Sequence, residues 1–375
     1  MKQFNIYLDN AAATPVRAEV MAEMMPYFDS KFGNPSSIHR YGREAKTALE
    51  SAREKCAEIL KCSAGEIIFT SGGTESDYLA ISGVVGSGNI DQLIVSQVEH
   101  PAVLQTAEHL MKTGLDVKFA SVNKDALYLI DDMHRQLVDN SLYSFIYANN
   151  EVGTINPIKE IATMVHKTNS YIHTDACQAA GYLDLNVNNL GVDLMSINGS
   201  KIYGPKGVGL LYIKDGTPFA PANIGGGQEY GLRGGTENVA AIVGLAKALE
   251  LCEANKHEEA RRISKLRDLL TNGLTKLGGI TLLGSKTDRL PNNVSVLIDG
   301  VDTQAILMKL DEVGVYCSVA SACSAEKTEP SHVLLAMGFS YEQSFQSLRF
   351  SLGNDTTEAD INNTIQMISK ILKKG

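Results

Sequence analysis

Short apolar runs alternate with helix-like segments through residues 43–213, and this alternation restricts the possible folds more than any other feature of the sequence. Helical patterns cover 43–61, 74–84, 103–113 and 158–168, and apolar runs of strand length cover 66–70, 92–96, 117–120, 144–148, 171–174, 194–197 and 208–213. Such alternation is typical of a mainly parallel sheet with helices on both faces. We therefore predict an α/β fold with a mainly parallel, seven-stranded sheet flanked by helices.

The rest of the chain has a different pattern. A long helical segment covers 239–277, and strand-like runs at 293–297, 313–317 and 348–351 accompany a helical pattern at 304–311. A last helix begins at Thr357, where Asp360 completes a capping-box pattern. Because 375 residues are too many for one small core, we predict two domains. The large domain covers 15–250, and a smaller α+β domain combines 1–14 with 251–375.

Composition excludes several classes of function. The formal net charge of −9 argues against binding to nucleic acid or to anionic membranes, because both depend on an excess of Lys and Arg. Residues 1–9 do not resemble a secretory signal, and no apolar run has the length of a membrane span. The six cysteines show neither a disulfide framework nor zinc-like spacing, which indicates a reducing compartment. We therefore expect a cytoplasmic protein without a metal site.

Two ionisable residues follow predicted strands whose ends should meet at one edge of the sheet. Lys201 comes shortly after the run 192–197, and Asp175 closes the run 171–174. Ligands of open α/β sheets bind at the carboxyl ends of the strands, where Thr70 and Asn149 should also lie. A lysine amine can form a Schiff base with the aldehyde of pyridoxal phosphate (PLP), and a carboxylate can keep its ring nitrogen protonated. Taken singly, a solvated lysine and a turn aspartate remain the simpler alternatives.

A glycine turn between a predicted strand and a predicted helix suits a phosphate monoester. Gly72 and Gly73 allow the backbone to approach an anion closely, Thr74 offers a hydroxyl, and the new helix directs free N–H groups at it. No Gly-Lys-Ser/Thr follows, so the turn is not a nucleotide P-loop. An ordinary strand-to-helix turn with Ser or Thr capping is the alternative.

Four further positions have side chains that suit the same site. The amides of Asn149 or Asn150 and of Gln178 could bond a phenolic oxygen, although Asn and Gln often only cap or turn. His100 could stack on a ring and transfer protons, or serve a structural role. Arg349 could hold a substrate carboxylate with its planar fork, or form a salt bridge.

Cys323 lies in a stretch of small residues without helical or strand periodicity. This composition favours a solvent-reached loop, whereas structural cysteines are buried. A free thiol has a pKa of roughly 8.5, so such a loop can present a usable thiolate fraction. Cys317 ends a strand-like run and is expected in the core.

Together these segments resemble the class V, fold-type I PLP enzymes, and most closely the cysteine desulfurases of the NifS/IscS type. The resemblance extends over nearly the whole chain, and the motifs occur in the family's order. The matching segments are 7–15 (YLDNAAATP), 32–36 (FGNPS), 70–76 (TSGGTES), 99–100 (EH), 149–151 (NNE), 174–178 (TDACQ), 201–207 (KIYGPKG), 233–236 (RGGT), 321–323 (SAC) and 349–353 (RFSLG).

The resemblance implies a role for each matching residue. Lys201 would be the Schiff-base lysine, Asp175 would contact the pyridine nitrogen, and Cys323 would accept the sulfur. His100 would stack on the ring and assist acid–base catalysis, and Asn34 and Arg349 would bind the substrate carboxylate. Further cofactor contacts are implied for Gly73, Thr74, Asn150, Gln178, Asn198, Ser200 and, from the other subunit of a homodimer, Thr236.

The resemblance also implies a reaction. L-cysteine would be converted to L-alanine, and its sulfur would pass to Cys323 as a persulfide. A sulfur-acceptor protein, either an iron–sulfur scaffold or a tRNA-thiolation enzyme, would then receive it. A class V aminotransferase and a selenocysteine lyase share the cofactor and are the alternative functions.

One departure from the family pattern concerns the cofactor. The family usually has a histidine directly before the lysine, and this chain has Ser200. We expect cofactor retention to be weaker by about 1 kcal/mol, the net contribution of a neutral hydrogen bond. A scaffold that has lost tight PLP binding is a further hypothesis, which the intact Lys201, Asp175 and Cys323 oppose.

Overall fold

The computed structural model of the chain describes residues 4–135, 137–319 and 329–373, and Cys323 therefore lies outside the described residues. The large sheet has seven strands in the order β2-β8-β7-β6-β5-β3-β4. All neighbouring pairs are parallel except those of β8, which is antiparallel to β2 and β7. The predicted sheet is thus confirmed. Its strands are β2 (Ile67–Thr70), β3 (Gln92–Ser96), β4 (Asp116–Ala120), β5 (Ser141–Ser144), β6 (Tyr171–Asp175), β7 (Leu194–Asn198) and β8 (Gly209–Ile213).

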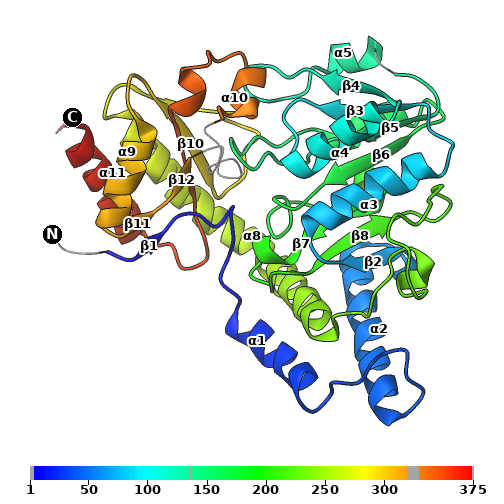
Figure 1. Cartoon of the computed structure of the whole chain (residues 1–375). Helices are drawn as coiled ribbons and strands as arrows, with labels where there is room; N and C mark the ends of the chain where they lie inside the picture. The colour runs from blue at the N-terminus through cyan, green and yellow to red at the C-terminus, as the bar shows by residue number, and fades with distance from the viewer. Residues whose placement is uncertain (1–3, 136, 320–328, 374–375) are drawn as a thin grey trace.

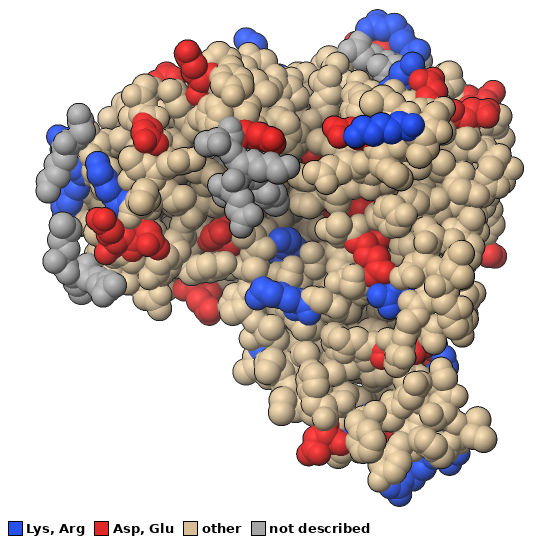
Figure 2. Space-filling model, in the orientation of Figure 1, with Lys and Arg blue, Asp and Glu red and all other residues tan. Residues whose placement is uncertain are grey.

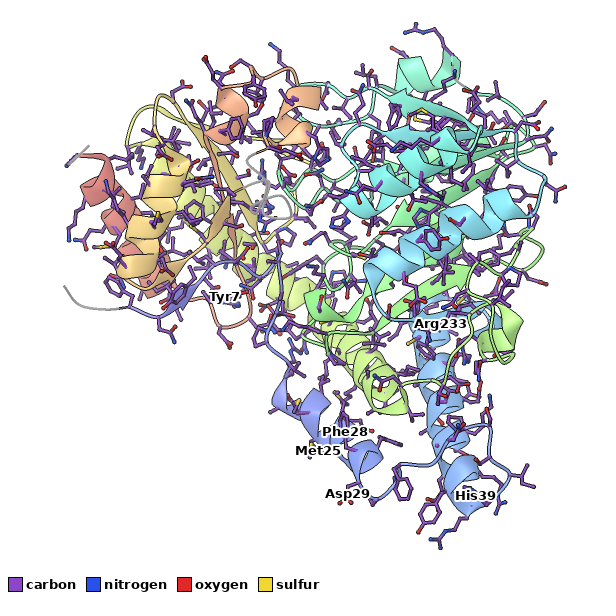
Figure 3. The ribbon with its side chains drawn as sticks, in the orientation of Figure 1. Tyr7, Met25, Phe28, Asp29, His39 and Arg233 are labelled. Carbon is purple, nitrogen blue, oxygen red and sulfur yellow. The ribbon has the colours of Figure 1, made fainter. Side chains whose placement is uncertain are left out.

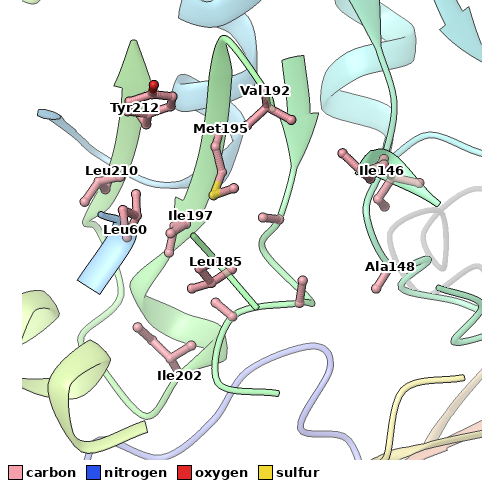
Figure 4. Close-up of a cluster of buried hydrophobic side chains, with 14 of the residues drawn as sticks. Leu60, Ile146, Ala148, Leu185, Val192, Met195, Ile197, Ile202, Leu210 and Tyr212 are labelled. Carbon is pink, nitrogen blue, oxygen red and sulfur yellow. The ribbon is translucent and has the colours of Figure 1, made fainter. Parts of the chain in front are cut away.

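Helices cover both faces of this sheet (Figure 1). Successive strand residues point to opposite faces, so Leu93 and Val95 pack under α3 (Gly73–Gly86) and α4 (Pro101–Lys112). Ile94 contributes to the other core, with residues of α2 (Arg40–Leu60) and α6 (Ile158–Val165). Part of that second core is drawn in Figure 4, where the labelled side chains include Leu60, Met195 and Leu210. The short helices α5 (Ile130–Arg135) and α7 (Val187–Leu190) complete this region.

A second, antiparallel sheet has four strands in the order β12-β13-β10-β9. Its strands are β9 (Ile280–Leu282), β10 (Asn293–Ile298), β12 (Ser318–Val319) and β13 (Ser347–Ser351), and the helices near it are α9 (Thr303–Glu312), α10 (His332–Ala336) and α11 (Glu358–Leu372). The capping box of Thr357 and Asp360 is present at the start of α11. The N-terminal strand β1 (Ile6–Tyr7) pairs in parallel with β11 (Val315–Tyr316). Ile6 and Leu8 therefore belong to the core of this region.

One helix of 37 residues, α8 (Val239–Thr275), extends from one region to the other (Figure 1). Its buried residues up to Cys252 pack in a core of the large sheet, and those from Ile263 onward pack in the core of the small sheet. The predicted division at 250 and 251 thus falls within a continuous helix. Within the described residues, no helix is long and apolar enough to cross a membrane.

The strand predicted at 144–148 is displaced in the structure, where β5 covers Ser141–Ser144. Both serines are fully buried. The Ser144 hydroxyl pairs with His173 Nδ1 at 2.8 Å, and the Ser141 N–H donates to the Ser170 hydroxyl. An apolar pattern cannot reveal a strand whose buried positions are hydrogen-bonded serines.

A buried ion pair fixes the segment between β8 and α8. The Arg53 guanidinium donates to both carboxylate oxygens of Glu229, at 2.7 and 2.9 Å, and also to the Ile67 carbonyl. Both side chains are at most 2% exposed. The Phe69 N–H donates to the same carboxylate. Glu229 and Tyr230 have φ angles of 47° and 59°, a region that disfavours side chains with a Cβ, so the ion pair holds the backbone in a strained turn.

Candidate active site

A cavity of about 290 Å³ lies at the carboxyl edge of the large sheet, where β6 and β7 end. Figure 2 shows that the middle of this face of the molecule is hollowed, with basic and acidic side chains nearby. The walls come from the large sheet, from the N-terminal segment and from β13. The lining residues are Ala11, Ala12, Gly73, Thr74, Asp77, His100, Ile146, Asn150, Asp175, Cys177, Gln178, Asn198, Lys201 and Arg349.

Lys201 and Asp175 lie in this cavity because their strands are neighbours. β6 and β7 are parallel, with Asp175 opposite Ser196, and Lys201 follows β7 in a 3-10 turn. Asp175 is 4% exposed and accepts the Cys177 N–H at 2.8 Å. The Lys201 amine donates to the Ala12 carbonyl. A buried carboxylate and an amine thus share one cavity.

The glycine turn at the start of α3 forms one wall. Gly72 has a φ of 150° and is the N-cap of the helix, without a side-chain cap. The first N–H groups of a helix have no partners within the helix and attract anions. Gly73 is also required by packing, because a Cβ at this position would lie 2.7 Å from Cys177 Sγ.

The polar residues predicted along this edge separate into two groups. Asn150, Gln178, His100 and Asn198 line the cavity, and the Gln178 amide donates to the Ala11 carbonyl at 3.0 Å. Asn149 instead has a structural role, because its oxygen accepts the N–H groups of residues 151 and 152 and its amide donates to the Val98 carbonyl.

Ser200 is directed at Asn198. The Ser200 N–H and its hydroxyl both donate to Asn198 Oδ1 at 3.2 Å. A backbone N–H can only donate, so this contact fixes which end of the amide is the oxygen. The donor end of Asn198, Nδ2, would lie 3.4 Å from a Cβ built on Gly73, and it therefore lies beside the uncapped helix start.

Arg349 reaches the cavity from β13. Its guanidinium donates to Asp9 at 2.9 Å and to the Asn150 carbonyl at 2.9 Å, so the salt bridge considered from the sequence is present. The side chain is 3% exposed, and its Nε has no hydrogen-bond partner among the described residues. Arg349 therefore brings a buried guanidinium with one unpaired N–H to the wall of the cavity.

Besides Ser200, which bonds Asn198, two other predicted residues do not line the cavity of a single chain. Asn34 is exposed, and its side chain accepts the Ser36 N–H in a turn between the 3-10 helix η1 (Met25–Phe28) and α2. The neighbouring residues Phe28 and His39, labelled in Figure 3, lie on an arm that projects from the body of the molecule. Asn34 therefore does not line the cavity of its own chain, and its contact with the substrate stays a prediction. Thr236 is exposed and lies three residues after Arg233 in the sequence. The Arg233 Nε atom is 2.9 Å from Glu75 Oε1.

Two lining residues with ionisable side chains, Cys177 and Asp77, were not predicted from the sequence. Cys177 fills the space beside Gly73. Asp77 lies on α3, one helical turn after Gly73. Asp77 is 1% exposed. Its sequence signal was weak, because a charged residue near a helix start is usually a solvated one.

Burial governs the electrostatics around the cavity. It lowers the pKa of His100, an effect that the charge of Asp175 opposes. It also raises the pKa of Glu99 to about 8, despite hydrogen bonds from the Ser96 hydroxyl and the Ile146 N–H. Neutral forms of both groups are thereby favoured.

The sequence matches the family model described as Aminotransferase class-V over residues 6–364. The chain belongs to the class V aminotransferase family. "Cysteine desulfurase IscS" of Dictyoglomus turgidum is 45% identical over 373 residues, which cover 98% of this chain and 95% of that protein. The protein of the same name from Methanosarcina thermophila is 43% identical, over 98% of this chain and 92% of its own length. A solved "NIFS-LIKE PROTEIN" has a TM-score of 0.93 and 35% identity, covering 99% of this chain and 100% of that chain.

These similarities confirm the predicted family and the fold-type I architecture, and with them a PLP-dependent enzyme of the cysteine desulfurase type. The cavity of this class V chain fits that cofactor. An uncapped helix start suits a phosphate, an amine suits an aldehyde, and a buried carboxylate suits a cationic ring nitrogen.

Proposed function

We propose that this cysteine desulfurase converts L-cysteine to L-alanine with Lys201 and Asp175 at its centre, and transfers the sulfur to Cys323. The observation that carries the proposal is that Lys201, Asp175 and Arg349 line one cavity. They come from three different strands: Asp175 ends β6, Lys201 follows β7, and Arg349 lies on β13. When bound, PLP supplies an aldehyde and an electron-withdrawing ring, which weakens the bonds at the substrate's α-carbon.

The phosphate would be held at the start of α3. Gly73 and Thr74 would contribute N–H groups of the uncapped first turn. Asn198 would contribute its Nδ2, because the two hydrogen bonds from Ser200 to Asn198 Oδ1 fix the orientation of the amide. Thr236 is assigned to the partner subunit's site in a homodimer, because it is exposed and does not line the cavity of its own chain. The same argument assigns Asn34 to a second copy.

The ring would lie against His100, with Asp175 at its nitrogen and the amides of Asn150 and Gln178 at its phenolic oxygen. Lys201 and His100 both line the cavity and can act as bases. Lys201 Nζ would take the α-proton of the bound amino acid, and His100 would exchange protons with the reacting groups. Because burial lowers the pKa of His100, its imidazole is available as a base at neutral pH.

The substrate carboxylate would bind Arg349. Two nitrogens of the Arg349 guanidinium donate to Asp9 and to the Asn150 carbonyl, and these bonds fix the plane of the group. The third nitrogen, Nε, has no acceptor within the described residues. A carboxylate there would satisfy a buried donor whose desolvation otherwise costs about 1–3 kcal/mol. Arg349 would therefore position the substrate as well as bind it.

Sulfur transfer would use Cys323. Its thiolate would attack the substrate sulfur, so that an S–S bond forms as the Cβ–S bond breaks, and Cβ takes up a proton to give alanine. Free cysteine and a cysteine thiol are thereby converted to alanine and a persulfide, with all atoms conserved. The outer sulfur of the persulfide would then pass to a sulfur-acceptor protein in the cytoplasm, either an iron–sulfur scaffold or a tRNA-thiolation enzyme.

The experiment locates the transferred sulfur atom. The holoenzyme is incubated with L-cysteine, and the added sulfur is located by mass spectrometry of its peptides. We expect it on Cys323 in the wild type and in Cys317→Ser, a control that removes a partly buried thiol six residues earlier in the sequence. Cys323→Ser should bind PLP but form no persulfide. Normal sulfide release by Cys323→Ser, or formation of a keto acid in place of alanine, would contradict the proposal.

A further inference from the structure

Asp77 is a second carboxylate in the cavity that also contains Asp175, and the mechanism above does not use it. It lies in the first turns of α3, is 1% exposed and lines the cavity. Its Oδ1 atom is buried and has no hydrogen-bond partner among the described residues. An ionised oxygen without a donor is costly in such a place. The geometry therefore favours a neutral Asp77 carboxyl group.

The group next to Asp77 does not supply a compensating positive charge. His173 Nε2 lies 3.7 Å from Asp77 Oδ1, but His173 is fully buried in β6. Its two ring nitrogens pair with the hydroxyls of Ser144 and Ser196, at 2.8 and 2.9 Å. Burial lowers the pKa of His173 to about 4, although Asp175 opposes the change. His173 is thus neutral at physiological pH, and Asp77 gains no ion pair from it.

The neighbouring carboxyl groups also favour the neutral form of Asp77. Burial and then the negative charge of Asp175 raise the pKa of Asp77, a hydrogen bond with Ser196 opposes this, and Glu99 adds to it. Two carboxylates in one buried site do not both ionise readily. The ionisable groups that face this space from the surrounding elements are Glu99, His100, His173, Asp175, Cys177 and Lys201.

We propose that Asp77 is a positioning residue that carries a proton beside Asp175 in the ligand-free cavity, and that it releases this proton when a cationic ring nitrogen pairs with Asp175. The proposal rests on the cofactor site proposed above. In the exchange the Asp77 carboxyl group loses one proton and the ring nitrogen gains one, so the summed charge of the pair is unchanged. Asp77 would thereby supply the proton that keeps the ring electron-withdrawing, without uptake from solvent.

The test counts protons on binding. The cofactor-free enzyme is titrated calorimetrically with pyridoxine 5′-phosphate, which has the ring nitrogen and the phosphate but no aldehyde. The titration is repeated in buffers of different ionisation enthalpy, at a mildly alkaline pH at which most of the free ligand's nitrogen is unprotonated. We expect Asp77→Asn to take up more protons from the buffer than the wild type, by about one per chain. Equal counts for the two proteins would overturn the proposal.

Two controls separate the charge of Asp77 from other effects of the substitution. Glu75→Gln removes a carboxylate two residues earlier on α3 that faces Arg233, and it should leave the proton count unchanged. With a benzene analogue that lacks the ring nitrogen, the wild type and Asp77→Asn should give the same count. A difference between them with that analogue would contradict the proposed exchange.

A spectroscopic measurement on the wild type does not depend on the folding of any variant. Infrared difference spectra should show that the C=O band of a protonated carboxyl group is lost when pyridoxine 5′-phosphate binds, and retained when the benzene analogue binds. Retention of the band with both ligands would refute the inference about Asp77. If neither ligand binds, the proposed cofactor site itself fails, and the two failures are therefore distinguishable.

Discussion

Replacing Glu229 with glutamine tests how strongly the buried pair with Arg53 stabilises the protein. Glutamine keeps nearly the same shape and can still accept the Phe69 N–H through its oxygen. The change removes the negative charge, however, and leaves the Arg53 guanidinium at 2% exposure with the Ile67 carbonyl and Glu50 as partners. Burial alone would lower the pKa of Arg53, and Glu229 reverses that shift. The variant therefore contains a buried cation with much less compensation.

The expected loss follows from this burial. Breaking a buried ion pair by removing one partner costs about 3–5 kcal/mol. Because the glutamine oxygen retains one hydrogen bond and Glu50 remains near, we expect the loss in Glu229→Gln to be about 3 kcal/mol. The two residues with positive φ, Glu229 and Tyr230, should also become less ordered, since the ion pair holds them in place.

The assay is urea unfolding, followed by circular dichroism, of four proteins in a double-mutant cycle. Arg53→Met combined with Glu229→Gln should lose much less than the sum of the two single variants, because neither charge is then left alone. The matched control is Lys55→Met, which removes one partner of an exposed pair between α2 and α8, with side chains 40% and 39% exposed. This control should cost less than about 1 kcal/mol. A similar loss in Glu229→Gln and Lys55→Met, or additive single losses in the cycle, would refute the reasoning.

Three further results are expected. Gly73→Ala should lower the free energy of unfolding by about 1–3 kcal/mol, because the added Cβ would overpack against Cys177 Sγ. Adding Cys177→Ala to this variant should restore most of the loss. If denaturant unfolding shows no recovery in the double variant, the contact between these two positions is not the cause. Glu99, whose folded pKa is about 8, binds its proton more tightly in the folded state, so wild-type stability should fall as pH rises from about 4.5 through 8. Glu99→Gln should flatten that slope in unfolding measured across pH. Ser200→Ala should weaken PLP binding severalfold, about 1 kcal/mol, by releasing the Asn198 amide, and an unchanged Kd would show that Asn198 needs no such support.

The large sheet could be predicted because its strands are buried on both faces. Leu93, Ile94 and Val95 form a continuous apolar run, and the predicted bounds of 92–96 are those of β3. Where buried positions are polar, the pattern failed. In β5, Ser141 and Ser144 are fully buried, and the Ser144 hydroxyl pairs with His173 of the neighbouring strand β6. Such pairing depends on which strands become neighbours, and this cannot be read from one segment.

The centre of the candidate site could be predicted for a related reason. Lys201 and Asp175 follow parallel strands, and sheet geometry alone brings those ends together. Asn34 belongs to an arm whose direction depends on tertiary packing, so its distance from the site could not be predicted. Asp77 is a charged residue in a helical segment, and it becomes buried because α3 packs on the face of the sheet, where Asp77 lies beside His173 of β6. The role of the Cys323 thiol as sulfur acceptor remains a prediction from the family resemblance.

The N-terminal segment has a consequence for how the protein is made. Ala11 and Ala12 form part of the cavity wall, and the segment is held by β1 against β11 and by Asp9 against Ser351 and Arg349. On the ribosome these early residues emerge long before residues 315–351. The large sheet can fold as a unit during synthesis, but its ligand site remains open on one side until the last strands have been translated. Competence to bind ligand is therefore a late event in the maturation of each polypeptide.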